Sequence, residues 1–182
     1  MAHYQIAVVV GSLRNDSFNK KLSAALQKLF PADFGFIEVR IDDLPPYNQD
    51  DDGQPCTQVT RLKGEISAAH GVLFVTPEYN RSIPGVLKNA IDHASRPYGQ
   101  SAWNGKPAGV TGASVGPMGT AMAQQHLRNI LAYLNMPVLG QPEAFVHHKE
   151  GLYDEAGNIG EASKKFLQGW VDAYVAWVKT HA

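Results

Sequence analysis

The sequence predicts an α/β fold in which a doubly wound sheet of five parallel strands lies between two layers of helices. Short apolar runs alternate along the chain with longer segments whose apolar residues recur at helical spacing, the pattern of repeated β/α units. The chain has 182 residues, 44% of them apolar, and it contains no internal repeat and no linker-like segment. These observations predict a single domain over residues 1–182 with a sizeable core.

The first two units occupy the start of the chain. An apolar run at residues 6–10 is typical of a buried strand, and helical spacing over residues 20–30 predicts the first helix. A second strand is expected at 35–41. A loop rich in Asp and Pro follows at 42–55 and leads to a helix at 59–69.

The remaining units follow the same alternation. Residues 72–76 and 107–114 predict buried strands, and a short fifth strand is expected at 138–139. Pro84 suits the first turn of a helix. The expected helices are residues 84–94, 118–134 and 161–179. The last helix carries apolar side chains on one face, which we expect to face the core: Phe166, Leu167, Trp170, Val171, Tyr174, Val175 and Val178.

Doubly wound sheets bind ligands beyond the carboxyl ends of their strands, where the strand order reverses. The loops after the first, third and fourth strands are therefore expected to form the site. We call them the first loop (residues 11–19), the second loop (residues 77–85) and the third loop (residues 112–119).

The first loop has the parts of a phosphate-binding site. It offers one cation, Arg14, and a helix N-terminus supplies free backbone N–H groups beside it. Its hydrogen-bonding side chains are Ser12, Asn15, Ser17 and Asn19. Neither G-x-G-x-x-G nor a Walker A sequence is present, which favours a terminal monophosphate over a pyrophosphate. The alternative is a helix capped by serine beside a surface arginine.

The second loop is stiffened by Pro77, Pro84 and Gly85, and it offers Tyr79 as an aromatic surface. A planar heterocycle could rest there with its edge against main-chain N–H groups. The alternative is an ordinary rigid turn in which Pro84 starts a helix.

The third loop is rich in glycine, which allows a ligand to approach the backbone closely. It also matches G-x-S-x-G, the nucleophile elbow of α/β-hydrolases. That alternative is an esterase with Ser114 as nucleophile, Asp154 or Asp172 as orienting residue and His181 as base. The penultimate position of His181 and the short chain argue against it.

Composition excludes several other classes of protein. The net charge is −1 and no basic cluster resembles a nucleic-acid patch. Cys56 is the single cysteine, so no internal disulfide forms. Asp50, Asp51 and Asp52 are expected in a solvated loop, and a metal site is the alternative. The first apolar run is too short to cross a membrane, and we expect a cytoplasmic protein that binds neither membranes nor nucleic acid.

Two motifs resemble the NADPH-dependent FMN reductase family, and within it the bacterial quinone and chromate reductases. The first is GSLR at residues 11–14, followed by Ser17 and Asn19. The second is TPEYN at residues 76–80, followed by Ser82, by PG at residues 84–85 and by LKNAID at residues 87–92. The resemblance implies a flavodoxin-like fold, bound FMN, NADPH or NADH as electron donor, and a quinone, flavin, azo or nitro compound, or chromate as small-molecule acceptor.

The resemblance also implies cofactor-binding residues, with hydride chemistry on the flavin and no catalytic residue of the protein's own. The FMN phosphate is assigned to Ser12, Arg14, Ser17 and Asn19, with Phe18 packing nearby. The isoalloxazine is assigned to Pro77, Glu78, Tyr79, Asn80, Ser82 and Ile83, with Ser114 and Gly116 at its other edge. The alternative within flavoproteins is a flavodoxin electron carrier, which a net charge of −1 argues against because such carriers are strongly acidic.

A homodimer or homotetramer is also expected. The segment at residues 96–103 holds Tyr98 and Trp103 in a loop with Gly and Ser, and exposed aromatic residues are enriched at protein interfaces. The alternative is a surface loop that folds back on its own chain.

Overall fold

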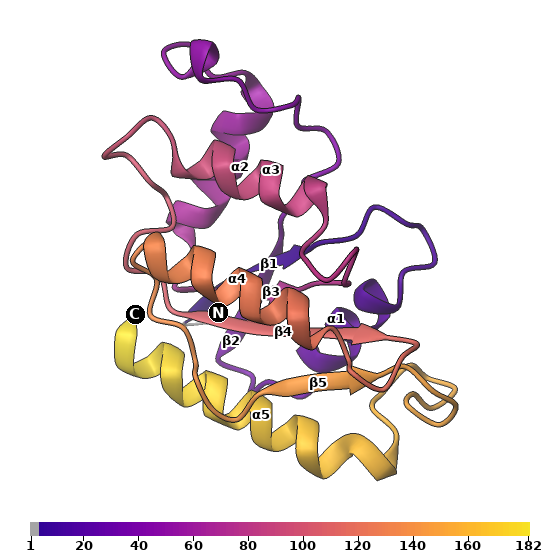
Figure 1. Cartoon of the computed structure of the whole chain (residues 1–182). Helices are drawn as coiled ribbons and strands as arrows, with labels where there is room; N and C mark the ends of the chain where they lie inside the picture. Colours follow the sequence, from indigo (N-terminus) through magenta and orange to yellow (C-terminus); the bar gives the residue numbers. More distant parts are fainter. Residues whose placement is uncertain (1–3) are drawn as a thin grey trace.

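The five strands form one parallel sheet in the order β2-β1-β3-β4-β5 in the computed structural model, which describes residues 4–182 (Figure 1). The strands are β1 (Tyr4–Val10), β2 (Phe34–Glu38), β3 (Gly71–Val75), β4 (Ala108–Ser114) and β5 (Ala144–His147). The helices are α1 (Phe18–Gln27), α2 (Thr57–Ala68), α3 (Gly85–Ser95), α4 (Ala121–Tyr133) and α5 (Glu161–His181), with a 3-10 turn η1 (Gln49–Asp51). The predicted α/β class and flavodoxin-like architecture are confirmed.

Helices cover both faces of the sheet because successive strand residues point to opposite sides. In β1, Ile6 and Val8 pack in one core with α1 and α5, whereas Ala7 and Val9 pack in the other with α2, α3 and α4. These four side chains are fully buried. Figure 1 shows α5 on the face of the sheet opposite to α4 and α3. The two cores therefore fix the sheet rigidly from both sides.

Local backbone chemistry explains where two helices begin. α1 begins at Phe18, two residues before the predicted start, because the Ser17 hydroxyl caps its first backbone N–H groups. α4 begins at Ala121, three residues after the predicted start. Gly119 and Thr120 have φ angles of 53° and 66°, a left-handed conformation that a right-handed helix does not accommodate.

The prediction of a fifth strand at residues 138–139 is wrong. Val138 forms only an isolated bridge with Ala108. Prolines at positions 137 and 142 lack the N–H that a strand interior needs, so regular pairing cannot extend through this segment. The strand lies instead at Ala144–His147, where Ala144 pairs with Thr111 of β4. β2 is also shorter than predicted, although Val39 and Ile41 beyond its end are buried.

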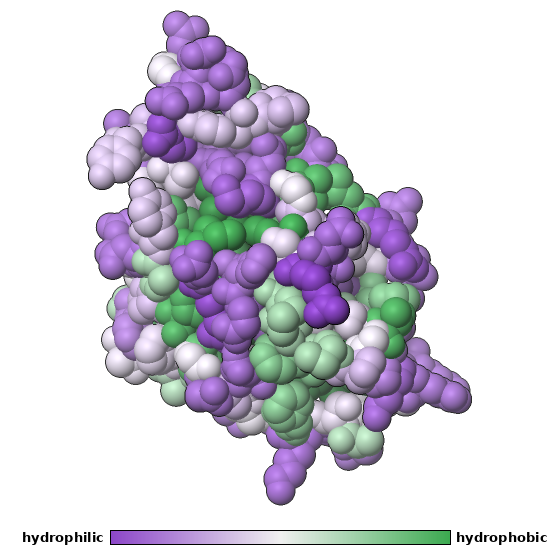
Figure 2. All heavy atoms as spheres, in the orientation of Figure 1, coloured by the Kyte–Doolittle hydropathy of each residue, from purple (hydrophilic) through white to green (hydrophobic). Residues whose placement is uncertain are grey.

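The acidic loop after β2 is only partly solvated. Asp50 and Asp51 are exposed, and Figure 2 shows a mostly hydrophilic surface where this loop lies at the top of the view. Asp52 departs from the expectation, because its carboxylate lies 3.2 Å from Nε of Arg96 and its side chain is only 18% exposed. Exposed Cys56 precedes α2 at the end of this loop.

Within residues 4–182, no helix is both long and apolar enough to cross a bilayer. The same residues gather no group of three or more His, Cys, Asp or Glu side chains that would hold a metal ion.

Trp103 is a core residue, so its predicted exposure at an interface is wrong. Its side chain is fully buried, its ring centroid lies 5.6 Å from that of Phe74, and Nε1 donates a 3.0 Å hydrogen bond to the carbonyl of Ile91. The loop at residues 96–103 thus folds back onto α3, and of its two aromatic side chains Tyr98, at 85% exposure, stays on the surface. The homodimer or homotetramer therefore stays a prediction, and Trp103 does not support it.

Trp103→Ala should lower the free energy of unfolding by about 3–5 kcal/mol, because it leaves a large cavity and removes the buried hydrogen bond to the Ile91 carbonyl. Tyr98→Ala in the same loop is the matched control and should change it by no more than about 0.5 kcal/mol. Urea denaturation of both variants measures the difference. Equal, small effects would place Trp103 outside the core.

Candidate active site

The first, second and third loops meet at the carboxyl edge of the sheet, as predicted. Val10 at the end of β1 pairs with Val75 at the end of β3, and Val75 pairs with Thr111 of β4. Two further hydrogen bonds extend this contact beyond the strands, from Gly11 N to the Val75 carbonyl and from Thr76 N to the Thr111 carbonyl. The starts of all three loops are therefore held side by side.

Gly11 and Gly112 are required because the chain packs closely around Thr76. A Cβ added at Gly112 would lie 2.0 Å from the Thr76 carbonyl oxygen, and one added at Gly11 would lie 2.9 Å from Thr76 Oγ1. Thr76 itself is fully buried. Glycine at these two positions lets three backbone segments converge at one point.

The first loop presents a set of free hydrogen-bond donors. Ser17 Oγ accepts from the backbone N–H groups of Asn19 and Lys20, so its own O–H is left to donate. The hydroxyl of Ser12, a residue only 6% exposed, has no hydrogen-bond partner among the described residues. The backbone N–H groups of residues 13–16 also have no acceptor there. Such donors at the start of a helix suit a phosphate.

Asn19 ties α1 to the sheet. Its Oδ1 accepts a 2.8 Å hydrogen bond from Ala113 N, and its Nδ2 donates a 3.0 Å bond to the Ala113 carbonyl. The residue is only 2% exposed. Asn19 therefore uses most of its amide to position the first loop against β4.

The charged side chains of the first loop lie near its surface. Arg14 is 55% exposed, lies 4.9 Å over the Phe18 ring and contacts Asp16 at 3.4 Å. Lys21 contacts the same carboxylate, and this hydrogen bond and charge hold the pKa of Asp16 below its usual value. Asp16 thus stays ionised and pairs with both Arg14 and Lys21 at the surface of the first loop.

His148 belongs to this corner, and the sequence pattern did not identify it. It follows β5, and its ring stacks on Phe18 with centroids 3.8 Å apart. Its buried Nδ1 has no partner in the described structure. Burial, then the positive charge of Lys21, lowers the pKa of His148 below its usual value. A neutral imidazole therefore completes the wall behind Phe18.

The second loop is a tight turn. Tyr79 and Ser82 exchange two backbone hydrogen bonds of 2.9 and 3.0 Å, and the two residues between them, Asn80 and Arg81, both have positive φ angles. This geometry presents the Tyr79 ring to solvent at 52% exposure. The backbone N–H groups of Glu78 and Asn80 have no acceptor among residues 4–182, so they remain free to donate to a ligand.

Glu78 caps a helix from another segment. Its Oε2 accepts hydrogen bonds of 3.0 and 3.1 Å from the backbone N–H groups of Met122 and Ala123, in the first turn of α4. The N-cap residue Thr120 makes no such bond with its own side chain. The carboxylate of Glu78 therefore joins the second loop to α4, and its backbone is what remains for a ligand.

The other predicted residues of the second loop vary in exposure. Ser82 Oγ lies 3.0 Å from Nδ1 of His126 at the surface. Pro77 is half-buried, whereas Ile83 is only 9% exposed and packs in the core with α3 and α4. Ile83 thus supports the loop from beneath.

Ser114 is not part of a hydrolase triad in this structure. Its Oγ donates a 2.9 Å hydrogen bond to the Gly116 carbonyl. The other members are engaged elsewhere: Asp154 with Asn158, Asp172 with Gln168, and His181 with the Trp177 carbonyl at the end of α5. The geometry therefore does not support the esterase alternative.

Each of the three loops carries large apolar side chains that are exposed. Leu13, Tyr79, Val115 and Met118 are between 43% and 69% exposed and come from all three loops. Large exposed apolar side chains gathered around a set of polar donors are typical of a binding site. This arrangement suits a phosphate joined to a flat, largely apolar ring system.

Comparison with known proteins agrees with this geometry. Residues 4–151 match the sequence model of a family described as NADPH-dependent FMN reductase. The chain belongs to this family. A 2-hydroxy-1,4-benzoquinone reductase of Burkholderia is 54% identical over 96% of both chains. A quinone reductase of Pseudomonas putida is 46% identical over 97% of this chain and 95% of the relative.

A solved structure gives the same result. FerB of Paracoccus denitrificans, a flavoenzyme NAD(P)H:(acceptor) oxidoreductase, is 47% identical and superposes with a TM-score of 0.94 over 98% of both chains. The family resemblance expected from the two motifs is thus confirmed. The chain is an oxidoreductase that uses FMN and NAD(P)H, and it is not solely an electron carrier.

Glu78→Ala should lower the free energy of unfolding by about 1–2 kcal/mol, because two N–H groups of α4 lose a charged acceptor. Glu78→Gln, which keeps an acceptor but no charge, should lose less. Glu155→Ala, at an exposed glutamate outside the site, is the control. Thermal unfolding of the four proteins makes the comparison. Equal stability of Glu78→Ala and the control would show that the Glu78 carboxylate does not stabilise α4.

Proposed function

We propose that this chain is an FMN-dependent NAD(P)H:quinone reductase whose flavin lies across the three loops. The observation that carries the proposal is the convergence of free donors in the first loop with free N–H groups in the second. The Ser12 hydroxyl, the Ser17 hydroxyl and the N–H groups of residues 13–16 would hold the phosphate, with Arg14 closing over it. Asn19 and Phe18 would position these groups from behind.

The second and third loops would hold the isoalloxazine. Free N–H groups of Glu78 and Asn80 would donate to acceptor atoms on the edge of the ring. Pro77, Tyr79 and Ser82 would line the same side, with Ile83 beneath them, and Ser114 and Gly116 would border the other edge. Because Ser114 and Gly116 are already joined by a hydrogen bond, this border is fixed before any ligand binds.

FMN, when bound, supplies the redox chemistry, since it takes two electrons from a nicotinamide and passes them to an acceptor. The residues around it bind and orient. Leu13, Tyr79, Val115 and Met118 would form an apolar rim at which the nicotinamide and then the acceptor bind in turn. A single shared face predicts ping-pong kinetics.

The apolar rim favours a quinone as acceptor, because a flat ring of low polarity buries apolar area against it. Two relatives, at 54% and 46% identity, carry names that refer to quinone reduction. Azo and nitro compounds, free flavins and chromate remain further acceptors to test.

The proposal is tested by anaerobic mixing of the FMN-loaded protein with NADPH or NADH, followed by a quinone. We expect the visible absorption of the flavin to bleach with the donor and to return with the quinone. Dichromate, an azo dye and a nitroaromatic compound serve as comparison acceptors. A protein that binds no FMN, or whose flavin is not bleached by either donor, would overturn the proposal.

Arg14→Ala should weaken FMN binding by roughly one to two orders of magnitude, since a charge-assisted bond to phosphate contributes about 1.5–3 kcal/mol. Riboflavin lacks the phosphate, so its affinity should change little. Lys165→Ala, at an exposed lysine on α5, controls for the change in net charge. Fluorescence titration of the apoprotein measures each affinity. Equal losses for the two ligands would show that Arg14 does not contact the phosphate.

A further inference from the structure

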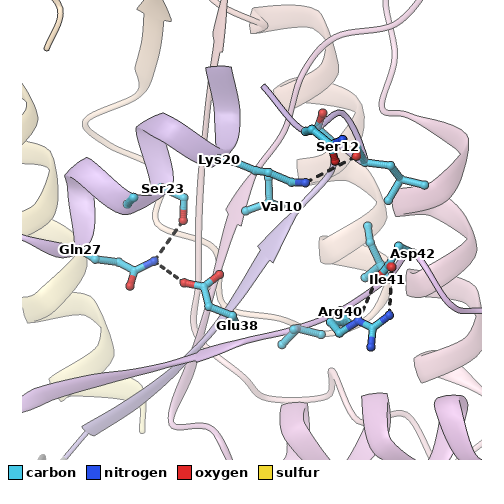
Figure 3. A pocket seen from close by; sticks show the side chains of 13 residues that line it. Val10, Ser12, Lys20, Ser23, Gln27, Glu38, Arg40, Ile41 and Asp42 are labelled. Atoms are coloured by element: carbon cyan, nitrogen blue, oxygen red, sulfur yellow. Dashed lines mark hydrogen bonds and ion pairs between the residues drawn. The ribbon is translucent and has the colours of Figure 1, made fainter. Parts of the chain in front are cut away.

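A cavity with a volume of about 480 Å³ lies between α1 and the carboxyl end of β2 (Figure 3). This size falls within the range of about 300–1,000 Å³ that is usual for small-molecule sites. The cavity shares Ser12, Leu13 and Asn15 with the first loop, so it adjoins the phosphate end of the proposed flavin site.

One end of the cavity is a row of hydrogen-bonding side chains. Gln27 Nε2 donates to Glu38 Oε1 at 2.5 Å and to Ser23 Oγ at 3.2 Å, and Figure 3 shows the three side chains directed toward one another. The second carboxylate oxygen of Glu38 has no partner among residues 4–182. It can accept a hydrogen bond from a hydroxyl or amino group of a ligand.

The other end of the cavity is cationic. Arg40 is neutralised by Asp42 through bonds of 3.1 and 3.0 Å. Lys20 has only a weak contact, 3.5 Å from its Nζ to the Leu13 carbonyl, and no carboxylate partner in the described part of the chain. Its ammonium group therefore remains available to an anion. Buried apolar side chains, Val39 and Ile41 among them, form part of the wall between the two ends.

The position of Glu38 indicates the class of ligand. Glu38 is the last residue of β2, beside β1, whose following loop would hold a phosphate. In dinucleotide-binding sheets an acid near this position hydrogen-bonds the ribose of the adenosine, with the phosphates at the neighbouring loop. A nucleoside also matches the lining, because it combines a flat apolar base with hydroxyl and amino donors.

Two other cavities fit this role less well. One is lined by parts of residues 45–63 and 93–97, and the other by parts of residues 95–104 and 133–135. Neither shares a residue with the three loops. A nucleotide bound in either cavity would contact none of the three loops that form the proposed flavin site.

We propose that the cavity between α1 and β2 binds the adenosine end of NAD(P)H while the nicotinamide lies at the apolar rim. Glu38 accepts hydrogen bonds from the nucleoside, and Lys20 contacts its phosphates. This inference rests on the proposed function, because it assumes that the donor is a nicotinamide dinucleotide. The first loop then separates the flavin phosphate on one side from the donor's adenosine on the other.

Calorimetric titration with ADP-ribose, which lacks the nicotinamide, tests the cavity directly on FMN-loaded protein. Ala24 is exposed and lines the cavity on α1, so Ala24→Trp fills it without disturbing the core. We expect Ala24→Trp to weaken ADP-ribose binding at least about tenfold. Ala176→Trp, at an exposed alanine on α5, should leave it within about twofold. Absence of ADP-ribose binding to the wild type, or equal binding by Ala24→Trp, would overturn the inference.

Kinetics with two donors provide a second measurement. Reduced nicotinamide mononucleotide carries the same nicotinamide as NADH but no adenosine. Glu38→Ala should raise the KM for NADH by about tenfold, the loss expected for one bond to a charged group, and leave the KM for the mononucleotide unchanged. Equal changes for the two donors, or none for NADH, would contradict the assignment. Failure of the proposed function looks different, because then neither donor bleaches the wild-type flavin.

Discussion

The geometry of the active site depends on the close packing of three chain segments around Thr76. Glycines at positions 11 and 112 let the first and third loops approach this residue, and the double hydrogen bond between Asn19 and Ala113 holds the start of α1 against β4. Because these contacts are made by buried backbone and side-chain groups, the donors of the first loop are placed before a ligand arrives. Preorganisation of this kind lowers the entropic cost of binding.

The second loop also supports a neighbouring segment, because it supplies the cap of α4. Ser17 caps the helix of its own loop, but α4 relies on Glu78, which comes from the loop after β3. A shift of the second loop would therefore expose the N-terminal N–H groups of α4, and a shift of α4 would move the turn that presents Tyr79. The site behaves as one unit for this physical reason, although its residues lie in distant parts of the sequence.

Sequence reasoning predicted the fold class, the three loops that meet at the site, and the family. These follow from local signals: apolar runs, helical spacing and two motifs. The fifth strand was misplaced because valine and leucine at positions 138 and 139 are typical of strands. The prolines at positions 137 and 142 prevent regular pairing there. Trp103 was expected at an interface because composition alone does not show that its loop returns to the Ile91 carbonyl. His148 was missed because only the folded chain brings it onto Phe18.

Cys56, the single cysteine, has a consequence for an enzyme of this kind. It is exposed at the start of α2, and the cavity it lines shares no residue with the three loops. Quinones are electrophiles that alkylate thiols, so a reductase that binds them risks covalent inactivation at any thiolate near its ring. This chain carries no sulfhydryl at the mouth of its site, and adduct formation would be confined to a remote position. The same thiol offers a unique attachment point for a dye or an electrode tether that leaves the flavin loops untouched.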